Sequence, residues 1–188
     1  MENDPLVQLY FFPDEKTKYD ITGHRGAGWG FGDTIVEVYN DSTQLDPFHE
    51  LVHVLGYKSG HPPAMLDEGL AVHLSEELGS DAFAGFIGYP GQTLDEVFKV
   101  LIRSDRLISI QQLFNYKEIA EAPDVVLAYV QSASFVKFLL KTGGRERFLD
   151  LFAGSGPNAI EANEALFEQI YEMSLLEAEK KWMRWLSF

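Results

Sequence analysis

The chain has 188 residues, enough for one domain of ordinary size, and 46% of them are hydrophobic, which suffices for a buried core. Acidic residues outnumber basic ones by 29 to 15, and the net charge of −14 disfavours nucleic acid as a partner because phosphate groups would be repelled. The absence of cysteine excludes disulfides and thiolate metal sites, so any zinc would be held by histidine and carboxylate.

Residues 1–5 are acidic and polar, and they lack the basic start and apolar core of a signal peptide. No continuous apolar run reaches the ~20 residues that a membrane-spanning helix needs. We therefore expect a soluble chain without a membrane span. The sequence leaves open its localisation, its oligomeric state and whether it is a piece of a longer protein.

Two strands are predicted near the N-terminus. Residues 6–12 (LVQLYFF) are rich in aliphatic and aromatic side chains, and residues 34–39 (TIVEVY) alternate apolar and polar side chains. The glycine-rich residues 23–32 (GHRGAGWGFG) are not followed by the Gly-Lys-Ser/Thr and the helix of a phosphate-binding loop. This stretch is either a flexible hairpin connection or a flap over a cleft.

The H-E-x-x-H arrangement of zinc-dependent hydrolases is present in residues 49–53 (HELVH). Residues four apart lie one turn above each other on a helix, so His49 and His53 can bring two imidazole nitrogens to one metal ion. Glu50 would lie beside them, where it can take a proton from a water molecule. The bare pattern occurs by chance in roughly one chain per hundred of this length, so a third ligand is needed to support it.

Glu68 supplies that third ligand, fourteen residues beyond His53 in residues 65–71 (MLDEGLA). Two neutral imidazoles and one carboxylate leave a zinc ion one open position, the usual composition of a hydrolytic site. Zinc lowers the pKa of a water molecule there towards ~7, and Glu50 would act as general base. The alternatives are exposed helix histidines and, for Glu68, a carboxylate that only complements a helix dipole.

The rest of the chain is predicted to be mostly helical. Asp46-Pro47 is typical of a helix start, and capping boxes open two further helices at residues 93–96 and 174–177. Helices are expected at about residues 46–55, between 63 and 79, at 93–103, 109–116, 124–143 and 145–152, and from 174 onwards.

The H-E-x-x-H stretch followed by residues 65–79 (MLDEGLAVHLSEELG) resembles the gluzincins, the zinc peptidases that include thermolysin and the aminopeptidases. It is most similar to bacterial peptidase-MA-like domains with a W-L-x-E-G-L-A motif. Met65 replaces the tryptophan of that motif, and His73 stands where a tyrosine is common. Residues 128–144 and 173–186 also resemble these domains, so the similarity covers about residues 34–188.

The resemblance implies a zincin-like α+β fold. A small antiparallel sheet, with residues 34–39 as an edge strand beside the H-E-x-x-H helix, would form an N-terminal lobe of about residues 1–57. A mostly helical lobe of about residues 58–188 would follow it in the same catalytic domain. The edge strand would pair with an extended peptide or protein substrate.

For the site, the resemblance implies Zn²⁺ held by His49, His53 and Glu68, and hydrolysis of peptide bonds with Glu50 as general base. Tyr129 is implied as the donor to the carbonyl oxygen, with a half-buried core tyrosine as the alternative. The aminopeptidase motif G-x-M-E-N has no match upstream of residue 49, which favours an endopeptidase-like specificity. The competing function is a non-hydrolytic, metal-containing module that binds peptides or proteins.

Two further side chains near the site have open roles. Asp67 can hold the second nitrogen of a ligand histidine, or it can cap the helix that carries Glu68. His73 lies five residues beyond Glu68 and on a different side of the helix, so it is not expected to be a fourth ligand.

Overall fold

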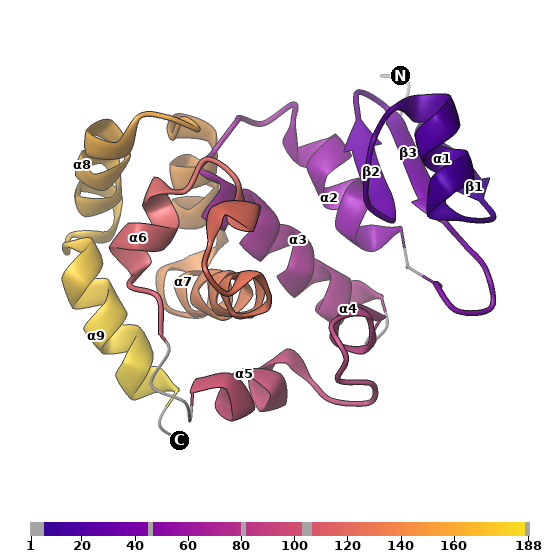
Figure 1. The fold of residues 1–188 in the computed structure, drawn as a ribbon. Coiled ribbons are helices and arrows are strands. Elements are labelled where there is room, and N and C mark those ends of the chain that lie inside the picture. Colours follow the sequence, from indigo (N-terminus) through magenta and orange to yellow (C-terminus); the bar gives the residue numbers. More distant parts are fainter. Residues whose placement is uncertain (1–5, 45–46, 80–81, 103–106, 187–188) are drawn as a thin grey trace.

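The computed structural model describes residues 6–44, 47–79, 82–102 and 107–186. It is a mixed α+β structure in which a small sheet lies at one side and a larger body of helices at the other (Figure 1). Helices α2 (Phe48–Gly56) and α3 (Ala64–Leu78) lie where the two parts meet, and they carry the predicted metal ligands. The predicted α+β class with a helical C-terminal part is confirmed.

The sheet contains three strands in the order β1–β3–β2. β3 (Thr34–Val38) runs antiparallel to β2 (Gly28–Phe31) but parallel to β1 (Gln8–Phe12). The prediction of an antiparallel sheet was therefore wrong for one of the two strand pairs. A parallel neighbour requires a crossover connection, and helix α1 (Glu15–Thr22) together with β2 supplies it before the chain returns as β3.

Helix α1 was not predicted, because residues 13–15 (Pro-Asp-Glu) read as the end of a strand. Asp14 is instead the N-cap of this helix, and its side chain accepts a hydrogen bond from the backbone nitrogen of Thr17 at 2.7 Å. The helix ends at Gly23, whose φ of 73° is a left-handed conformation that glycine adopts without strain. Its sequence, EKTKYDIT, is short and mostly polar, so apolar periodicity does not mark it.

β3 is the central strand of the sheet, so the prediction that residues 34–39 form the edge strand was wrong. Its residues 35–38 are each at most 4% exposed, which leaves neither face of the strand open to solvent. The edge strand beside α2 is β2, built from the glycine-rich stretch that was expected to be a loop or flap. Glycine is needed there because a Cβ on Gly30 would lie 2.8 Å from the backbone oxygen of Glu50.

Helix α3 packs closely along α7 (Val125–Gly154), the longest helix of the described residues. A Cβ on Gly69 would lie 2.7 Å from the carbonyl oxygen of Ser132, so glycine allows this approach. The N-cap predicted for α2 at Asp46 lies outside the described residues, and Pro47 directly precedes the helix.

Helix α7 begins after the predicted N-cap Asp124, whose side chain accepts a hydrogen bond from the backbone nitrogen of Leu127 at 3.0 Å. Gly144, at φ 82° and ψ 164°, breaks the helical geometry where the sequence predicted two separate helices. By length and composition alone α7 is apolar enough to cross a membrane. However, 61% of its most apolar 18-residue window is buried inside the protein, as in the core helix of a globular domain.

The remaining helices surround α7 (Figure 1). Both predicted capping boxes form, with Thr93 and Glu96 bonded reciprocally at 2.8 and 3.3 Å and Ser174 and Glu177 at 2.9 and 3.3 Å. Trp182 is a buried core residue, and its ring nitrogen donates to Ser134 Oγ at 3.1 Å. The elements not yet named are α4 (Ala82–Phe86), α5 (Leu94–Ile102), α6 (Ile110–Asn115), the 3₁₀ helix η1 (Ile119–Glu121), α8 (Ile160–Tyr171) and α9 (Leu175–Trp185).

Candidate metal centre

Three side chains from α2 and α3 converge on one point, as the sequence predicted. His49 Nε2 lies 3.3 Å from His53 Nε2 and 3.3 Å from Glu68 Oε2, and His53 Nε2 lies 3.5 Å from the same carboxylate oxygen. Ligand atoms at the ~2.0–2.1 Å typical of zinc, in tetrahedral directions, are ~3.3–3.4 Å apart. The three atoms therefore outline one face of a tetrahedron of the right size, and this group could hold a metal ion.

Asp67 orients one of the two histidines. Its Oδ2 atom lies 3.0 Å from His53 Nδ1, which leaves His53 Nε2 directed at Glu68. This hydrogen bond is the outer contact that commonly fixes the ring orientation of a metal-binding histidine. Of the two roles that the sequence left open for Asp67, the structure therefore shows the contact to His53.

The electrostatics of the cluster favour a positive charge at its centre. Burial lowers the pKa of His53, but its hydrogen bond to Asp67 and its contact with the Glu68 carboxylate outweigh burial and raise the pKa to about 10. Burial likewise raises the pKa of Glu68, but the two imidazoles close to its Oε2 atom outweigh burial and lower the pKa to about 2. Either a proton or a cation can provide the charge that these contacts stabilise.

Glu50 packs against two glycines of β2, Gly28 and Gly30. Its carboxylate occupies the space of the missing side chain of Gly28, since a Cβ there would collide with Glu50 Oε1. The backbone N–H of Gly30 donates to the same carboxylate. Burial raises the pKa of Glu50, and the neighbouring imidazoles only partly oppose it. A carboxyl group with a raised pKa is suited to taking up and returning a proton near neutral pH.

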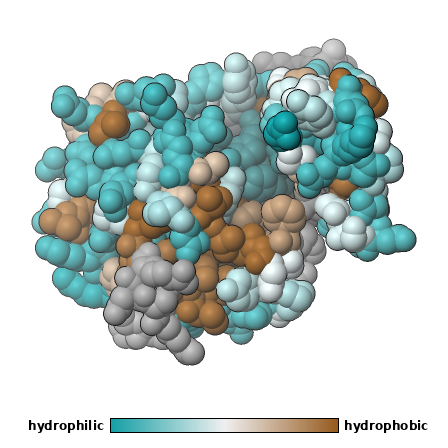
Figure 2. Space-filling model, viewed as in Figure 1, coloured by the Kyte–Doolittle hydropathy of each residue, from teal (hydrophilic) through white to brown (hydrophobic). Residues whose placement is uncertain are grey.

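Two cavities meet at this cluster, and both are lined by Gly28, His49, Glu50 and Tyr129. The larger one, of about 830 Å³, is a groove between β2 on one side and α2 and the start of α3 on the other. The smaller one, of about 250 Å³, is mainly apolar and lies on the α4 side, where hydrophobic side chains also gather on the surface (Figure 2). Its apolar lining is Ala27, Phe83, Phe86, Ile87, Val125 and Val126.

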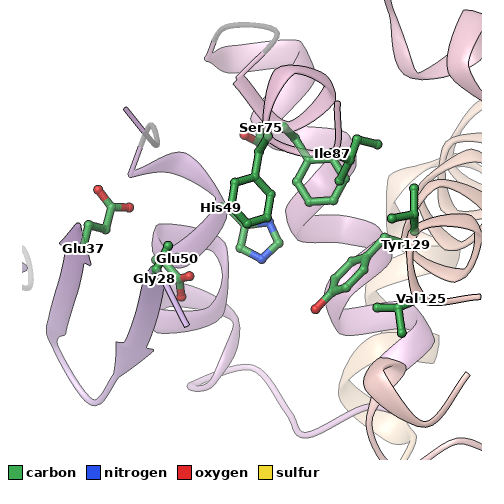
Figure 3. A pocket seen from close by; sticks show the side chains of 12 residues that line it. Gly28, Glu37, His49, Glu50, Ser75, Ile87, Val125 and Tyr129 are labelled. Carbon is green, nitrogen blue, oxygen red and sulfur yellow. The ribbon is translucent and has the colours of Figure 1, made fainter. Parts of the chain in front are cut away.

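Tyr129 lies on the second turn of α7, and its hydroxyl group points into the same space that His49 and Glu50 face (Figure 3). The ring of Phe83 is near both aromatic rings of the site. Its centre lies 5.9 Å from that of His49, on which it is stacked, and 5.6 Å from that of Tyr129. Burial, together with the charges of Glu68 and Glu50, raises the pKa of Tyr129, so its hydroxyl stays protonated and able to donate. This location fits the donor role predicted for Tyr129.

The structure also shows contacts that the sequence did not predict. Phe83 belongs to α4, a five-residue helix with no capping or periodicity signal, so nothing in the sequence pointed to it. The link between β2 and Glu50 did have a signal, the alternating glycines, but their partner helix was not identifiable from the sequence. His73 is buried outside the cluster and lines neither cavity, in agreement with its exclusion as a ligand.

No family model, no curated protein and no solved structure matches this chain. The described fold and site therefore define its class on their own. The chain is a mixed α+β protein with a three-stranded sheet, and two of its helices bring together a His-His-Glu group able to hold a metal ion.

Proposed function

We propose that this protein is a zinc-dependent hydrolase that cleaves peptide bonds, with Zn²⁺ held by His49, His53 and Glu68. The observation that carries the proposal is the triangle of ligand atoms, with sides of 3.3 to 3.5 Å, directly beside the half-buried carboxylate of Glu50. A zinc ion bound there would polarise both a substrate carbonyl group and a water molecule. The resemblance of residues 49–79 to the gluzincins supports the same assignment.

In this proposal Glu50 performs the proton transfers. It takes a proton from the attacking water, whose oxygen forms a bond to the carbonyl carbon. It then delivers that proton to the amide nitrogen as the carbon–nitrogen bond breaks, which yields a carboxylic acid and an amine. Tyr129 donates a hydrogen bond to the carbonyl oxygen while negative charge develops on it.

The free edge of β2, rather than residues 34–39, would bind the substrate backbone. The carbonyl oxygen of Ala27 accepts a hydrogen bond from Val38 at 2.8 Å, so Ala27 pairs with the sheet. Pairing alternates along an antiparallel strand, and the backbone groups of Gly28 and Gly30 therefore face the free edge. The N–H of Gly30 contacts the Glu50 carboxylate, so the N–H of Gly28 and the carbonyl oxygens of both glycines are left for a peptide. An extended peptide lying along this edge would place one of its peptide bonds next to Glu50.

The smaller cavity would hold one apolar side chain of the substrate beside the cleaved bond. Its volume of about 250 Å³ is below the ~300–1,000 Å³ of pockets that take a whole small ligand. We expect the larger side chain of Val126→Phe to fill this space. For peptides whose side chain next to the cleaved bond is Leu or Phe, kcat/KM should then fall by about 10- to 100-fold relative to peptides with Ala there. The reason is that burying a Leu or Phe side chain contributes ~1.5–3 kcal/mol.

The matched control for this variant is Val100→Phe, which makes the same replacement at an exposed position of α5 that lines neither cavity. It should leave the preference of the protein unchanged in a peptide-library assay. If the two variants have the same preference as the original chain, the smaller cavity does not hold a substrate side chain.

The proposal as a whole is tested by metal content and chelation. The purified chain is expected to bind about one equivalent of zinc and to hydrolyse labelled casein. Treatment with a zinc chelator should abolish the hydrolysis, and added Zn²⁺ should restore it. Hydrolysis that persists in fully metal-free protein would contradict the proposal. Chelation that unfolds the chain would favour a structural role for the metal, and thermal melting with and without metal distinguishes these outcomes.

A further inference from the structure

Arg25 supplies a positive charge to the groove of a strongly acidic protein. Among the described residues that line the larger cavity it is the only lysine or arginine, whereas the chain as a whole has a net charge of −14. It lies in the loop that leads into β2, the strand proposed to pair with substrate. Its position therefore gives one end of the groove a charge opposite to that of most of the surface.

The structure holds the backbone on both sides of Arg25 in place. The fully buried Lys18 directs its ammonium group at the carbonyl oxygens of His24 and Gly26, at 3.5 and 3.2 Å, and at His24 Nδ1, at 3.1 Å. Burying an ammonium group is costly unless its donors are satisfied, and these contacts engage them. The guanidinium carbon of Arg25 lies 4.8 Å from the centre of the Tyr19 ring, a cation–π contact that orients the side chain.

The guanidinium group of Arg25 has N–H donors that form no ion pair with another described residue. This planar group offers five N–H donors that match a carboxylate. The acidic side chains that line the groove contact other residues than Arg25. Asp67 and Glu68 contact the two histidines, and Glu50 packs against β2. Burial and the charge of Lys18 lower the pKa of His24, so the neighbouring imidazole is neutral and adds no charge of its own.

We infer that Arg25 forms a carboxylate-binding subsite of the groove, which recognises an acidic side chain or the terminal carboxylate of a peptide substrate. The inference rests on the proposed function, because it assigns a substrate class to the same groove. Arg25 is three residues before Gly28, and Gly28 lies beside Glu50. Three residues span at most ~10–11 Å of backbone. An extended peptide advances ~3.3 Å per residue, so the recognised carboxylate would lie about two to three residues from the cleaved bond.

The test uses heptapeptides with one cleavable site, an acetylated N-terminus and an amidated C-terminus. In the first set a single Glu is placed at each position in turn. In the second set Gln replaces that Glu. A third set ends in a free carboxylate two or three residues from the site, and a fourth has the same length with a terminal amide. Affinity is measured by calorimetry on zinc-loaded Glu50→Gln protein, which is expected not to turn the peptides over. The ratio of kcat/KM between paired peptides is measured on the protein with Glu50 intact.

We expect a roughly fivefold preference for the carboxylate over its neutral partner at one position, the upper end of what an ion pair with an exposed arginine contributes. Arg25→Gln should abolish this preference, and Arg25→Lys should retain part of it. The control Arg145→Gln removes the same charge from an exposed site on α7 and should keep the preference. A gain in the Glu set identifies an acidic side chain as the ligand, and a gain in the free-acid set identifies the chain terminus.

Equal affinity for charged and neutral peptides, or loss of the preference in Arg145→Gln as well, would overturn the assignment of Arg25. Hydrolysis without any preference for a carboxylate would overturn this inference and leave the proposed function intact. A protein that neither binds nor cleaves any of the peptides with zinc loaded would contradict both.

Discussion

Replacing Glu50 by glutamine is expected to reduce peptide hydrolysis by about 10²–10⁴-fold while zinc stays bound, because the variant lacks the group that accepts and returns the proton. Glutamine has the same shape, so it fits the space over Gly28 where the Glu50 carboxylate lies. Its side-chain oxygen can still accept the hydrogen bond from the backbone of Gly30. Initial rates on labelled casein and metal content by atomic spectroscopy measure the two parts of this prediction.

Two controls make this result specific. The thermal midpoint of Glu50→Gln should match that of the unmodified protein, which excludes misfolding as the cause of inactivity. Gln112→Glu, an isosteric change at an exposed position of α6, should retain activity. If Glu50→Gln cleaved peptides as fast as the unmodified protein, Glu50 would not be the general base. If neither protein cleaved them, the result would favour the alternative that the protein is a non-hydrolytic binding module.

Replacing Glu68 by glutamine is expected to weaken zinc binding by at least ~10²-fold. Four-ligand zinc sites bind with ~10–16 kcal/mol, so a single ligand contributes about 3 kcal/mol, and the change also removes the only anionic ligand of this group. Hydrolysis should fall in parallel and should recover in part at high zinc concentration. Competition with a chromogenic chelator measures the affinity.

The matched control is Glu77→Gln, on the same helix α3 but exposed to solvent. This variant loses the same charge and should bind zinc as the unmodified chain does. Zinc affinity that is unchanged in Glu68→Gln would mean that Glu68 is not a ligand, and the three-residue site would have to be abandoned.

Local sequence signals predicted α2, α3, α5, α6, α7, α9 and the candidate ligands, but they missed α1, α4 and α8. The spacing of His49 and His53 has a direct meaning on a helix, where four residues make about one turn. The capping boxes at Thr93 and Ser174 also depend on neighbouring residues only, and both form. Glu68 was identifiable because it follows in a recognisable motif, and its convergence with the histidines agrees with that prediction.

The sheet was predicted less well, because strand order depends on contacts between distant segments. Residues 34–39 alternate apolar and polar side chains like a strand with one exposed face, yet they form the central strand. The glycines of residues 23–32 favour a loop by propensity, but the close approach of α2 makes them the residues that fit at the edge. In both cases packing against another element outweighed the local preference.

By itself the sequence determined which side chains can form the candidate metal centre, since helical periodicity and the types of ligand are local properties. Only the tertiary structure decided what surrounds that centre. It placed Glu50 against β2, Asp67 against His53, and Phe83 against both His49 and Tyr129. These contacts join segments from separate parts of the chain, and they depend on how closely the backbones approach, which no local pattern encodes.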